Sequence, residues 1–351
     1  MNRVRFADID IHESFFDTLK NDYPGFEQWF DKKAQAGDKA FVIRNAKGEI
    51  DGFLYVKLEN GVLEDVVPPL PARNRLKIGT FKIDAHGTKL GERFLKKVLD
   101  HAISKGLDSI YVTVFEKHTG LTRLFDKYGF VKVATKSSVT GESELVLERD
   151  LTHHDAHIIH DYPFIHTASA RKYLLAIYPE FHTQLLPDSI LNNESYDVLK
   201  DLSHTNSIHK IYVCHMDVDI LKVGDILVIY RTKDKNDTGS AEYRSVVTSI
   251  GVVEEIKQGR DFATLTSFVD YCAPYSVFSE DELKEEYRRK YNLRVIKFTY
   301  NAAVAKKLIR KTLAENIGLD RNDRWGFLSL TDEQFEAIID LGGVNASLII
   351  D

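Results

Sequence analysis

Apolar positions in the first 150 residues switch repeatedly between the period of strands and the period of helices. VRFADIDI has apolar residues at every second position, and AFVIRN, IDGFLYVKLEN, RLKIGTFKIDA, SIYVTVF, FVKVATKS and ELVLERD are also predicted strands. Helices are predicted over residues 14–20, 24–36, 88–105 and 119–129. Phe26, Trp29 and Phe30 fall at i, i+3 and i+4 of the second helix, which favours a stripe buried in the core. This alternation predicts an α/β domain.

The pattern changes at a histidine-rich segment that begins LTHHDAHIIHDYP. We expect a linker at residues 151–171, between one domain at 1–150 and another at 172–351. Further on, strands are predicted at 209–216, 225–232, 245–256 and 293–300. Helices are predicted at 168–178, 279–291, 301–316 and 331–343. The last helix opens with Thr331 and Gln334 in the capping-box pattern.

Composition indicates a globular protein without membrane association. Hydrophobic residues make up 43% of the chain and charged residues 28%. No apolar run approaches the roughly 20 residues that cross a bilayer, and MNRVRFADIDIHE lacks the apolar core of a signal peptide. Cys214 and Cys272 form no CxxC pair, which favours reduced thiols. We therefore expect a cytoplasmic protein.

The charge is uneven along the chain. The net charge is −6; residues 1–150 sum to +1 and the remainder to −7. A protein that holds nucleic acid mainly through phosphates carries a basic field, and this chain has none in bulk. Any contact with RNA must therefore be local, and the acidic second half also suits a protein partner.

The stretch IDAHGTKLGERFLKK leaves a predicted strand through Gly87 and Gly91 and enters a basic amphipathic helix. Unpaired amides and the dipole at a helix N-terminus attract anions such as pyrophosphate, and glycines allow close approach. A purely structural turn is an equal alternative. The P-loop pattern GxxxxGK[ST] and the dinucleotide fingerprint GxGxxG are both missing. An acyl-CoA site is the third kind of anion site that suits such a turn.

The order of elements over residues 3–150 resembles the GNAT superfamily of N-acetyltransferases, which implies a mixed sheet with flanking helices and acetyl-CoA as co-substrate. HGTKLG partly fits the family signature [QR]-x-x-G-x-[GA], with His86 and Lys89 as departures from it. VTVFEKHTGLTRLFDKYGF at 112–130 resembles the family's fifth strand and fourth helix. The resemblance implies that pantetheine pairs with the backbone near Phe81 and Ile83. It implies that the pyrophosphate lies on amides of Gly87, Lys89, Leu90, Gly91 and Glu92, beside His86.

The catalytic positions depart from that family. Phe125 stands where a tyrosine often reprotonates the CoA thiolate, and it cannot donate a proton. Tyr128 is the nearest hydroxyl, and His118, where asparagine is frequent, is a candidate acid or base or else a backbone-bonded helix start. Glu59 is a candidate base acting directly or through water. Two hypotheses remain open: a transferase with a different acid, and an acyl-CoA sensor without turnover.

From about residue 172 the chain resembles the PUA-like superfamily, which includes ASCH, EVE and YTH domains and implies an α+β fold with a small β-barrel. The matching segments are 173–188, 204–216, 222–232 and 246–256, with the KxGD turn most specific. The ASCH motif GxKxxExR is missing, so an EVE-like description is safer. Such domains often bind RNA or a modified base, although HTNS also suits a self-capping loop. The candidate contacts are His204, Asn206, Ser207, Tyr230 and Arg231.

Histidines His153, His157 and His160 would share one helix face in the linker. No carboxylate–histidine spacing such as HExxH accompanies them. We therefore expect no metal site.

Overall fold

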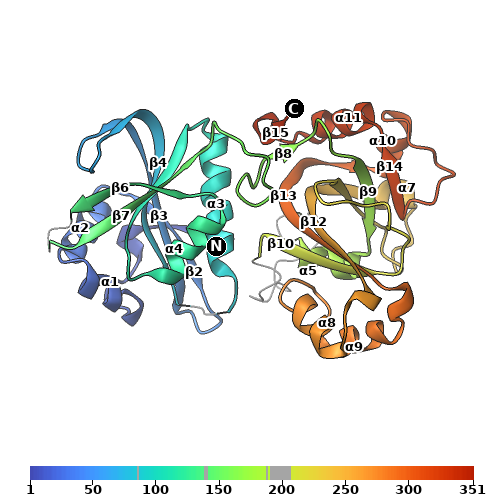
Figure 1. Ribbon diagram of the computed structural model, residues 1–351, viewed down its shortest axis with the longest axis horizontal. Helices are drawn as coiled ribbons and strands as arrows, with labels where there is room; N and C mark the ends of the chain where they lie inside the picture. Colours follow the sequence, from blue (N-terminus) through green and yellow to red (C-terminus); the bar gives the residue numbers. More distant parts are fainter. Residues whose placement is uncertain (85–86, 138–140, 187–188, 190–206) are drawn as a thin grey trace. The chain divides into compact units, whose positions relative to one another are not determined.

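The computed structural model describes residues 1–84, 87–137, 141–186, 189 and 207–351 (Figure 1). It divides the chain into two compact units, Met1–His160 and Asp161–Asp351. The division falls within the segment 151–171. Each unit has its own central sheet and its own hydrophobic core.

The N-terminal unit is built on a seven-stranded mixed sheet in the order β1-β2-β3-β4-β5-β7-β6. β4 and β5 are parallel, and the other neighbouring strands are antiparallel. This confirms the predicted mixed α/β architecture and its order of elements. The strands are β1 (Asn2–Arg5), β2 (Lys39–Arg44), β3 (Ile50–Leu63), β4 (Leu70–Ile83), β5 (Ser109–Phe115), β6 (Val131–Ser137) and β7 (Ser143–Asp150); the α-helices are α1 (Asp17–Asp22), α2 (Phe26–Gln35), α3 (Leu90–Ser104) and α4 (Thr119–Lys127).

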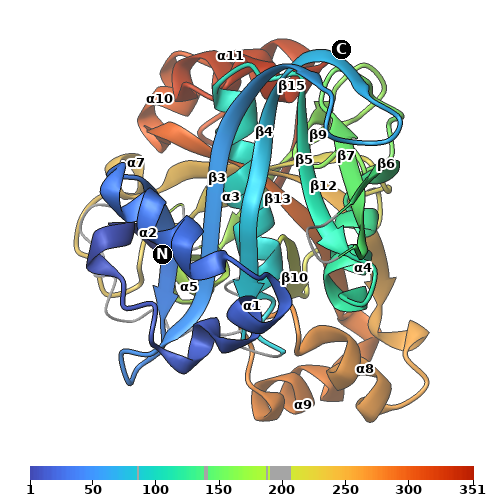
Figure 2. The same ribbon diagram turned by 90° about the vertical axis from the view of Figure 1, so that its left-hand side faces the viewer.

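Helices cover both faces of this sheet: α1 and α2 lie on one face, and α3 and α4 on the other (Figures 1 and 2). Phe53 of β3 packs against Phe30 of α2, in an aromatic cluster that confirms the predicted core stripe. The preceding residue, Gly52, faces the opposite way, and an added Cβ there would lie 2.8 Å from the Phe94 ring of α3. Alternation along one strand thus assigns the α2 and α3 helices to opposite faces.

The C-terminal unit is built on a six-stranded sheet in the order β10-β13-β12-β11-β9-β14. Its first and last strands, β8 and β15, form a separate two-stranded sheet. β9 and β11 are parallel, and the other neighbours are antiparallel. Over the described residues no pairing joins β10 to β14, so closure into a barrel stays a prediction. The strands are β8 (Ile165–His166), β9 (Lys172–Ile177), β10 (His209–Cys214), β11 (Ile226–Arg231), β12 (Val246–Gln258), β13 (Arg294–Ile309), β14 (Phe327–Leu330) and β15 (Ile349–Ile350).

The α-helices of this unit flank the sheet. Residues of α8 and α9 bury Ile211 and Val213 of β10, while α11 packs on β13, where a Cβ on Gly342 would lie 2.7 Å from Val304. The predicted capping box at Thr331 is confirmed, since its hydroxyl accepts a hydrogen bond from the Gln334 amide. The helices are α5 (Pro179–Leu185), α7 (Ala241–Arg244), α8 (Leu265–Cys272), α9 (Glu280–Arg288), α10 (Arg310–Glu315) and α11 (Asp332–Gly342).

Two of the predicted helices are wrong. Residues 172–177, predicted as helix, form the fully buried strand β9, and residues 301–309 belong to the long strand β13 rather than to a helix. A strand buried on both faces has a continuous apolar run without alternation, and periodicity cannot distinguish that run from a buried helix. In β13, bulges opposite β12 break the period of two.

The close contact at Gly52 predicts a stability effect. We expect Gly52→Ala to destabilise the protein by about 1–3 kcal/mol, because the new methyl group would collide with the buried Phe94 ring. Gly120→Ala in α4 is the matched control, since nothing lies within 4 Å of its added Cβ. Alanine favours helix, so the control should be neutral or slightly stabilising. Urea denaturation of both variants measures this, and equal midpoints would contradict the packing at Gly52.

Candidate functional site

The parallel strands β4 and β5 pair over only four residues each. The paired positions run from Arg75 opposite Ser109 to Ile78 opposite Val112. β4 continues to Ile83 and β5 to Phe115, and the described backbone contains no further pairing between them. The C-terminal ends of the two strands therefore part, which leaves one edge of β4 with backbone donors and acceptors directed away from β3.

A bulge in β4 stands at the point of separation. Tyr55 and Val56 are consecutive in β3, but their partners are Thr80 and Ile78, so Gly79 is the extra residue. An added Cβ on Gly79 would lie 2.8 Å from the Tyr55 ring, which explains a glycine there. Bulges bend and twist a strand, and this one lies directly after Ile78, the last residue of β4 that pairs with β5.

The N-terminus of α3 follows the free edge of β4. Gly87 has φ +79° and Lys89, the N-cap, has φ +58°, so two residues just before the helix adopt left-handed backbone conformations. Nothing lies within 4 Å of a Cβ placed on Gly87, whereas on Gly91 it would lie 2.9 Å from Leu124 of α4. Gly91 thus also serves helix packing, and Leu90 is buried. His86 lies outside the described residues.

A charged pair connects the first turn of α3 to α4. Lys127 Nζ lies 3.0 Å from Glu92 Oε1, and the Glu92 side chain is buried. Lys127 also lies over the Tyr128 ring, 5.0 Å from its centroid. Because Glu92 stands in the first turn, its carboxylate lies where the helix dipole favours negative charge. The backbone amides of this turn, with Lys89 at its start, are the groups that could hold a diphosphate.

Aromatic rings line the α3–α4 face beside the separated strands. Phe81 of β4 contacts Phe94 of α3 and Phe125 of α4, each with ring centroids 5.6 Å apart. Phe125 is fully buried, and so is Tyr128, whose phenol does not reach the solvent. The wall is apolar, which suits the alkyl part of a pantetheine arm and supplies no exposed proton donor.

The end of β5 contacts the segment that joins α1 to α2. His118, the N-cap of α4, lies with Nε2 3.5 Å from Asp22 Oδ2, and Lys117 Nζ lies 2.8 Å from Asp22 Oδ1. Tyr23 stacks on Phe115 with ring centroids 5.0 Å apart. Burial, followed by the carboxylates of Glu144 and Asp22, raises the pKa of the Tyr23 phenol. His118 is therefore part of a polar group that sequence reasoning did not recognise around Tyr23.

Glu59 stands at the opposite end of the β4–β5 ladder. Its cross-strand partner is Arg75, the first residue that pairs with β5. Its carboxylate accepts a hydrogen bond from Tyr111 and is ion-paired with Lys57. Burial acts to raise the pKa of Glu59, but the hydrogen bonds from Lys57 and Tyr111 outweigh it and hold the pKa below its usual value. The structure thus separates Glu59 from the other candidate catalytic residues.

The three described residues among those predicted to contact RNA are buried. Tyr230 and Arg231 of β11 are 2% and 8% exposed, and Tyr230 packs against Trp325. Ser207 is buried too, and its hydroxyl accepts a hydrogen bond from the His209 amide. His204 and Asn206 lie outside the described residues. Tyr230 and Arg231 are thus buried in this structure, and their contact with RNA stays a prediction.

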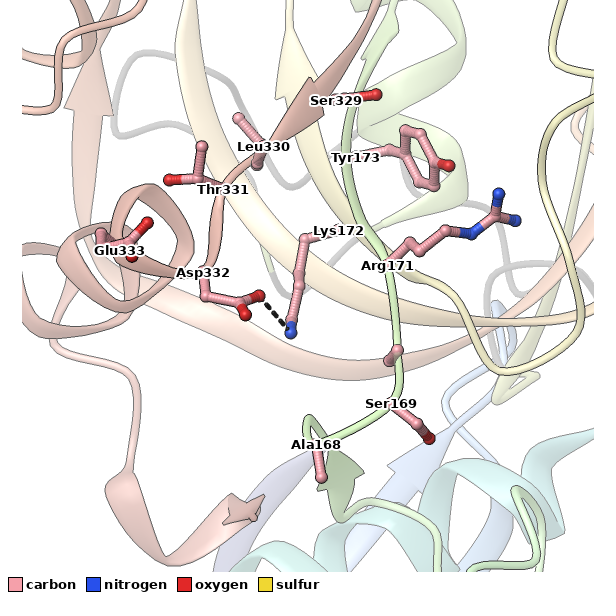
Figure 3. A pocket seen from close by; sticks show the side chains of 11 residues that line it. Ala168, Ser169, Arg171, Lys172, Tyr173, Ser329, Leu330, Thr331, Asp332 and Glu333 are labelled. Atoms are coloured by element: carbon pink, nitrogen blue, oxygen red, sulfur yellow. Dashed lines mark hydrogen bonds and ion pairs between the residues drawn. The ribbon is translucent and has the colours of Figure 1, made fainter.

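A pocket of about 510 Å³ opens in the C-terminal unit between residues 168–173 and 329–333 (Figure 3). Lys172 Nζ lies 2.6 Å from Asp332 Oδ1 and donates to the Thr167 carbonyl at 2.9 Å. Arg171 Nη2 lies 2.6 Å from Asp225 Oδ2. Each cation of the pocket is thus engaged by a carboxylate of the same unit, and the pocket indicates no particular ligand.

Two further kinds of site were sought in the described part of the chain. No group of three or more histidine, cysteine or acidic side chains converges there as metal ligands would. No helix among the described residues has the length and apolar character needed to span a bilayer.

No protein-family model matches the sequence, and no curated protein matches it. Several solved structures are similar to parts of the chain. They include a GNAT family acetyltransferase from Elizabethkingia anophelis with acetyl-CoA bound, at 16% identity over 41% of this chain and 94% of that chain, with a TM-score of 0.31. Ard1 from Thermoplasma volcanium is 17% identical over 42% of this chain and 95% of that chain, with a TM-score of 0.34.

ASCH from Zymomonas mobilis is also similar, at 10% identity over 48% of this chain and 94% of that chain, with a TM-score of 0.34. Acetyltransferases and an ASCH protein are thus both among the similar structures. TM-scores this low carry no information about activity, so the activity is inferred below from the residues and their geometry.

The environment of Glu59 predicts a pH-dependent contribution to stability. The lowered pKa means that ionised Glu59 stabilises the fold above its unfolded pKa of about 4.3, and that this stabilisation is lost as pH falls through the lower folded value. We expect the unfolding free energy of the wild type to exceed that of Glu59→Gln near pH 6, with a smaller difference near pH 3. Denaturant titrations at several pH values measure this, and a difference that does not change with pH would contradict it.

Proposed function

We propose that residues 1–150 form an N-acetyltransferase that uses acetyl-CoA as co-substrate. Its reaction transfers the acetyl group to an amine, and the C-terminal unit recognises the acceptor or an RNA that carries it. The observation that carries the proposal is the separation of β4 from β5 after Ile78 and Val112, next to the N-terminus of α3. The resemblance of the sequence to the GNAT superfamily supports the same assignment.

The geometry suits each part of an acyl-CoA molecule. The β4 backbone from Phe81 to Ile83 can pair with the amides of pantetheine, as one strand pairs with the next. Amides from Gly87 to Gly91, with the Lys89 side chain, would receive the diphosphate, whereas the Glu92 amide already donates to the Lys89 carbonyl at 3.0 Å. Phe81 and Phe125 would line the alkyl part of the arm. Apolar walls with a few directed polar groups are typical of cofactor sites.

Acyl transfer to an amine makes modest demands on side chains. The amine nitrogen, after losing a proton, forms a bond to the thioester carbon; the carbon–sulfur bond breaks, and the thiolate leaves with a proton. Positioning the two reactants supplies much of the rate. His118, one-third exposed near the end of β5, is the candidate that handles a proton. Tyr128 suits that role less well because its side chain is fully buried, and Glu59 because it lies at the other end of the β4–β5 ladder.

An acyl-CoA sensor without turnover is the second candidate. Phe125 favours it, because a buried phenyl ring lies where the family often has a phenol that serves as acid. Binding uses the backbone of β4 and α3 and does not require that acid. The two candidates therefore share the site and differ only in turnover.

CoA binding should depend on Lys89. We expect Lys89→Gly to weaken CoA binding roughly threefold to tenfold through the loss of one charge near the diphosphate. Stability should be retained, because glycine accepts the φ of +58° more readily than lysine does. Lys105→Ala, at the other end of α3, is the control and should bind CoA as the wild type does. Calorimetric titration with CoA measures this; absence of binding by the wild type would refute the acyl-CoA site.

Turnover distinguishes the transferase from the sensor. We expect thiol release from acetyl-CoA with an amine panel, and at least a tenfold loss of release in His118→Ala with CoA binding unchanged. The variant should fold, because the His118 side chain makes no capping hydrogen bond to α4. Tight CoA binding without thiol release for any amine would favour the sensor.

A further inference from the structure

Strand β3 continues well beyond the strand that pairs with its outer edge, the edge that faces β2. β2 pairs with β3 from Ile50 to Leu54, whereas β3 extends to Leu63 in a long hairpin with β4 (Figure 2). In the described part of the chain, no backbone–backbone hydrogen bond or β-bridge reaches the outer edge of β3 beyond Leu54. This edge therefore presents backbone donors and acceptors with which a further strand can pair.

The free part of the outer edge has definite ends. It begins at Tyr55, directly after the last residue that pairs with β2. At the other end, the ladder of β3 with β4 becomes irregular between Gly61 and Leu63, and such irregularities bend a strand. The regular free segment is thus 55–61, with the sequence YVKLENG, and Leu58 is its central residue.

Side chains along this segment are exposed, and an apolar one stands at its centre. Leu58 is 52% exposed, and Lys57 and Asn60 are exposed as well. A lysine on a free edge commonly prevents pairing with another chain, which is the ordinary interpretation of Lys57. Here, however, the Lys57 ammonium is ion-paired with Glu59 of the same strand, so its charge is balanced and does not by itself repel a second strand.

The segment is complementary to itself in one register. When two copies pair antiparallel about Leu58, each Lys57 lies opposite the Glu59 of the other copy, and the two Leu58 side chains lie opposite each other. Opposite charges and apolar pairs in such positions stabilise a sheet, whereas like charges destabilise it. A pair centred on Lys57 or on Glu59 would place like charges opposite each other. The charges therefore favour Leu58 as the centre.

We propose that the protein forms a symmetric dimer in which β3 pairs antiparallel with β3 of a second copy, centred on Leu58. The two β3–β4 hairpins then form one four-stranded antiparallel sheet. Such an interface is isologous: the same patch serves both copies, so association stops at two. A strand pair this short buries less surface than a standard interface, so we expect a reversible dimer with a dissociation constant of about 1–100 µM. This inference does not depend on the proposed acetyl transfer.

Sedimentation equilibrium of the full chain tests the dimer. We expect the wild type to associate in this concentration range and Leu58→Lys to be monomeric, because the substitution places two ammonium groups opposite each other at the two-fold axis. Val131→Lys is the matched control: it adds the same charge at an apolar position, 59% exposed, on the edge strand β6. It should associate as the wild type does. A monomeric wild type, or a dimer that Val131→Lys dissociates and Leu58→Lys does not, would overturn the inference.

Exchange of charges tests the register independently of folding. Lys57→Glu should weaken association at least tenfold, because two carboxylates then lie opposite each other on each side of the axis. Adding Glu59→Lys to that variant restores opposite charges across the pair, and association should recover. A double variant as weak as the single one would contradict the register.

A disulfide gives the same register directly. We expect Leu58→Cys to form a covalent dimer under an added oxidant, since opposite Cβ atoms in an antiparallel pair lie roughly 4.5–5.5 Å apart. Asn60→Cys is the control, because the register places each Asn60 opposite Val56 of the other copy. The native thiols, Cys214 and Cys272, are buried and do not compete. Covalent dimers of Asn60→Cys without those of Leu58→Cys, measured by non-reducing electrophoresis, would refute the proposed pairing.

Discussion

The short parallel ladder between β4 and β5 is the constraint on which the candidate site of the N-terminal unit depends. The ladder begins where Arg75 of β4 pairs with Ser109 of β5, and we call this its closed end. The buried Arg75 guanidinium stabilises this end: it lies 2.9 Å from Glu148 and donates to the carbonyls of Gly61 and Pro71. Ser109 of β5 donates to the same Glu148 carboxylate at 2.6 Å. Because these groups satisfy one another, the closed end tolerates a buried charge, and separation of the strands is confined to the other end.

Separation of two strands exposes backbone groups that must find partners. The backbone groups of β4 that face β3 are paired along the strand, so only those on its other edge need partners. On the α3–α4 face, aromatic rings keep the helices packed across the separated strands. The opposite face has the Tyr23–Phe115 stack. The unit can therefore keep its strands apart without losing its core, which is what a binding cleft at a sheet edge requires.

The N-terminal architecture was predictable because its periods are clear and its turns carry glycines. Helix α3 and the strands before and after it have the predicted places, and Phe26 and Phe30 are core residues as predicted. Prediction failed in β9 and β13, where burial on both faces and bulges remove the period of two. Tyr230 and Arg231 were chosen by residue type, but tertiary packing buries them.

The candidate site itself was only partly predictable for a related reason. Its anion-binding part consists of backbone amides near Gly87, which a turn signal can indicate, whereas the contacts of Tyr23 with Phe115 and of Asp22 with His118 arise only when the α1–α2 connection packs on the end of β5. Tertiary packing decides which carboxylate a lysine pairs with: Lys136 lies opposite Glu144 in the ladder, but its ammonium pairs with Asp65.

The two faces of the sheet therefore divide the chemistry. One face offers amides and an apolar wall, groups that bind without changing protonation. The other offers a carboxylate, a phenol and His118, groups that respond to charge. Phe125 has no proton to donate and the Tyr128 phenol is fully buried, so His118, near the end of β5, is the candidate for proton transfer under the proposed function. A sequence change on one face can then alter turnover and leave cofactor binding intact, which is how one fold can supply both a transferase and a sensor.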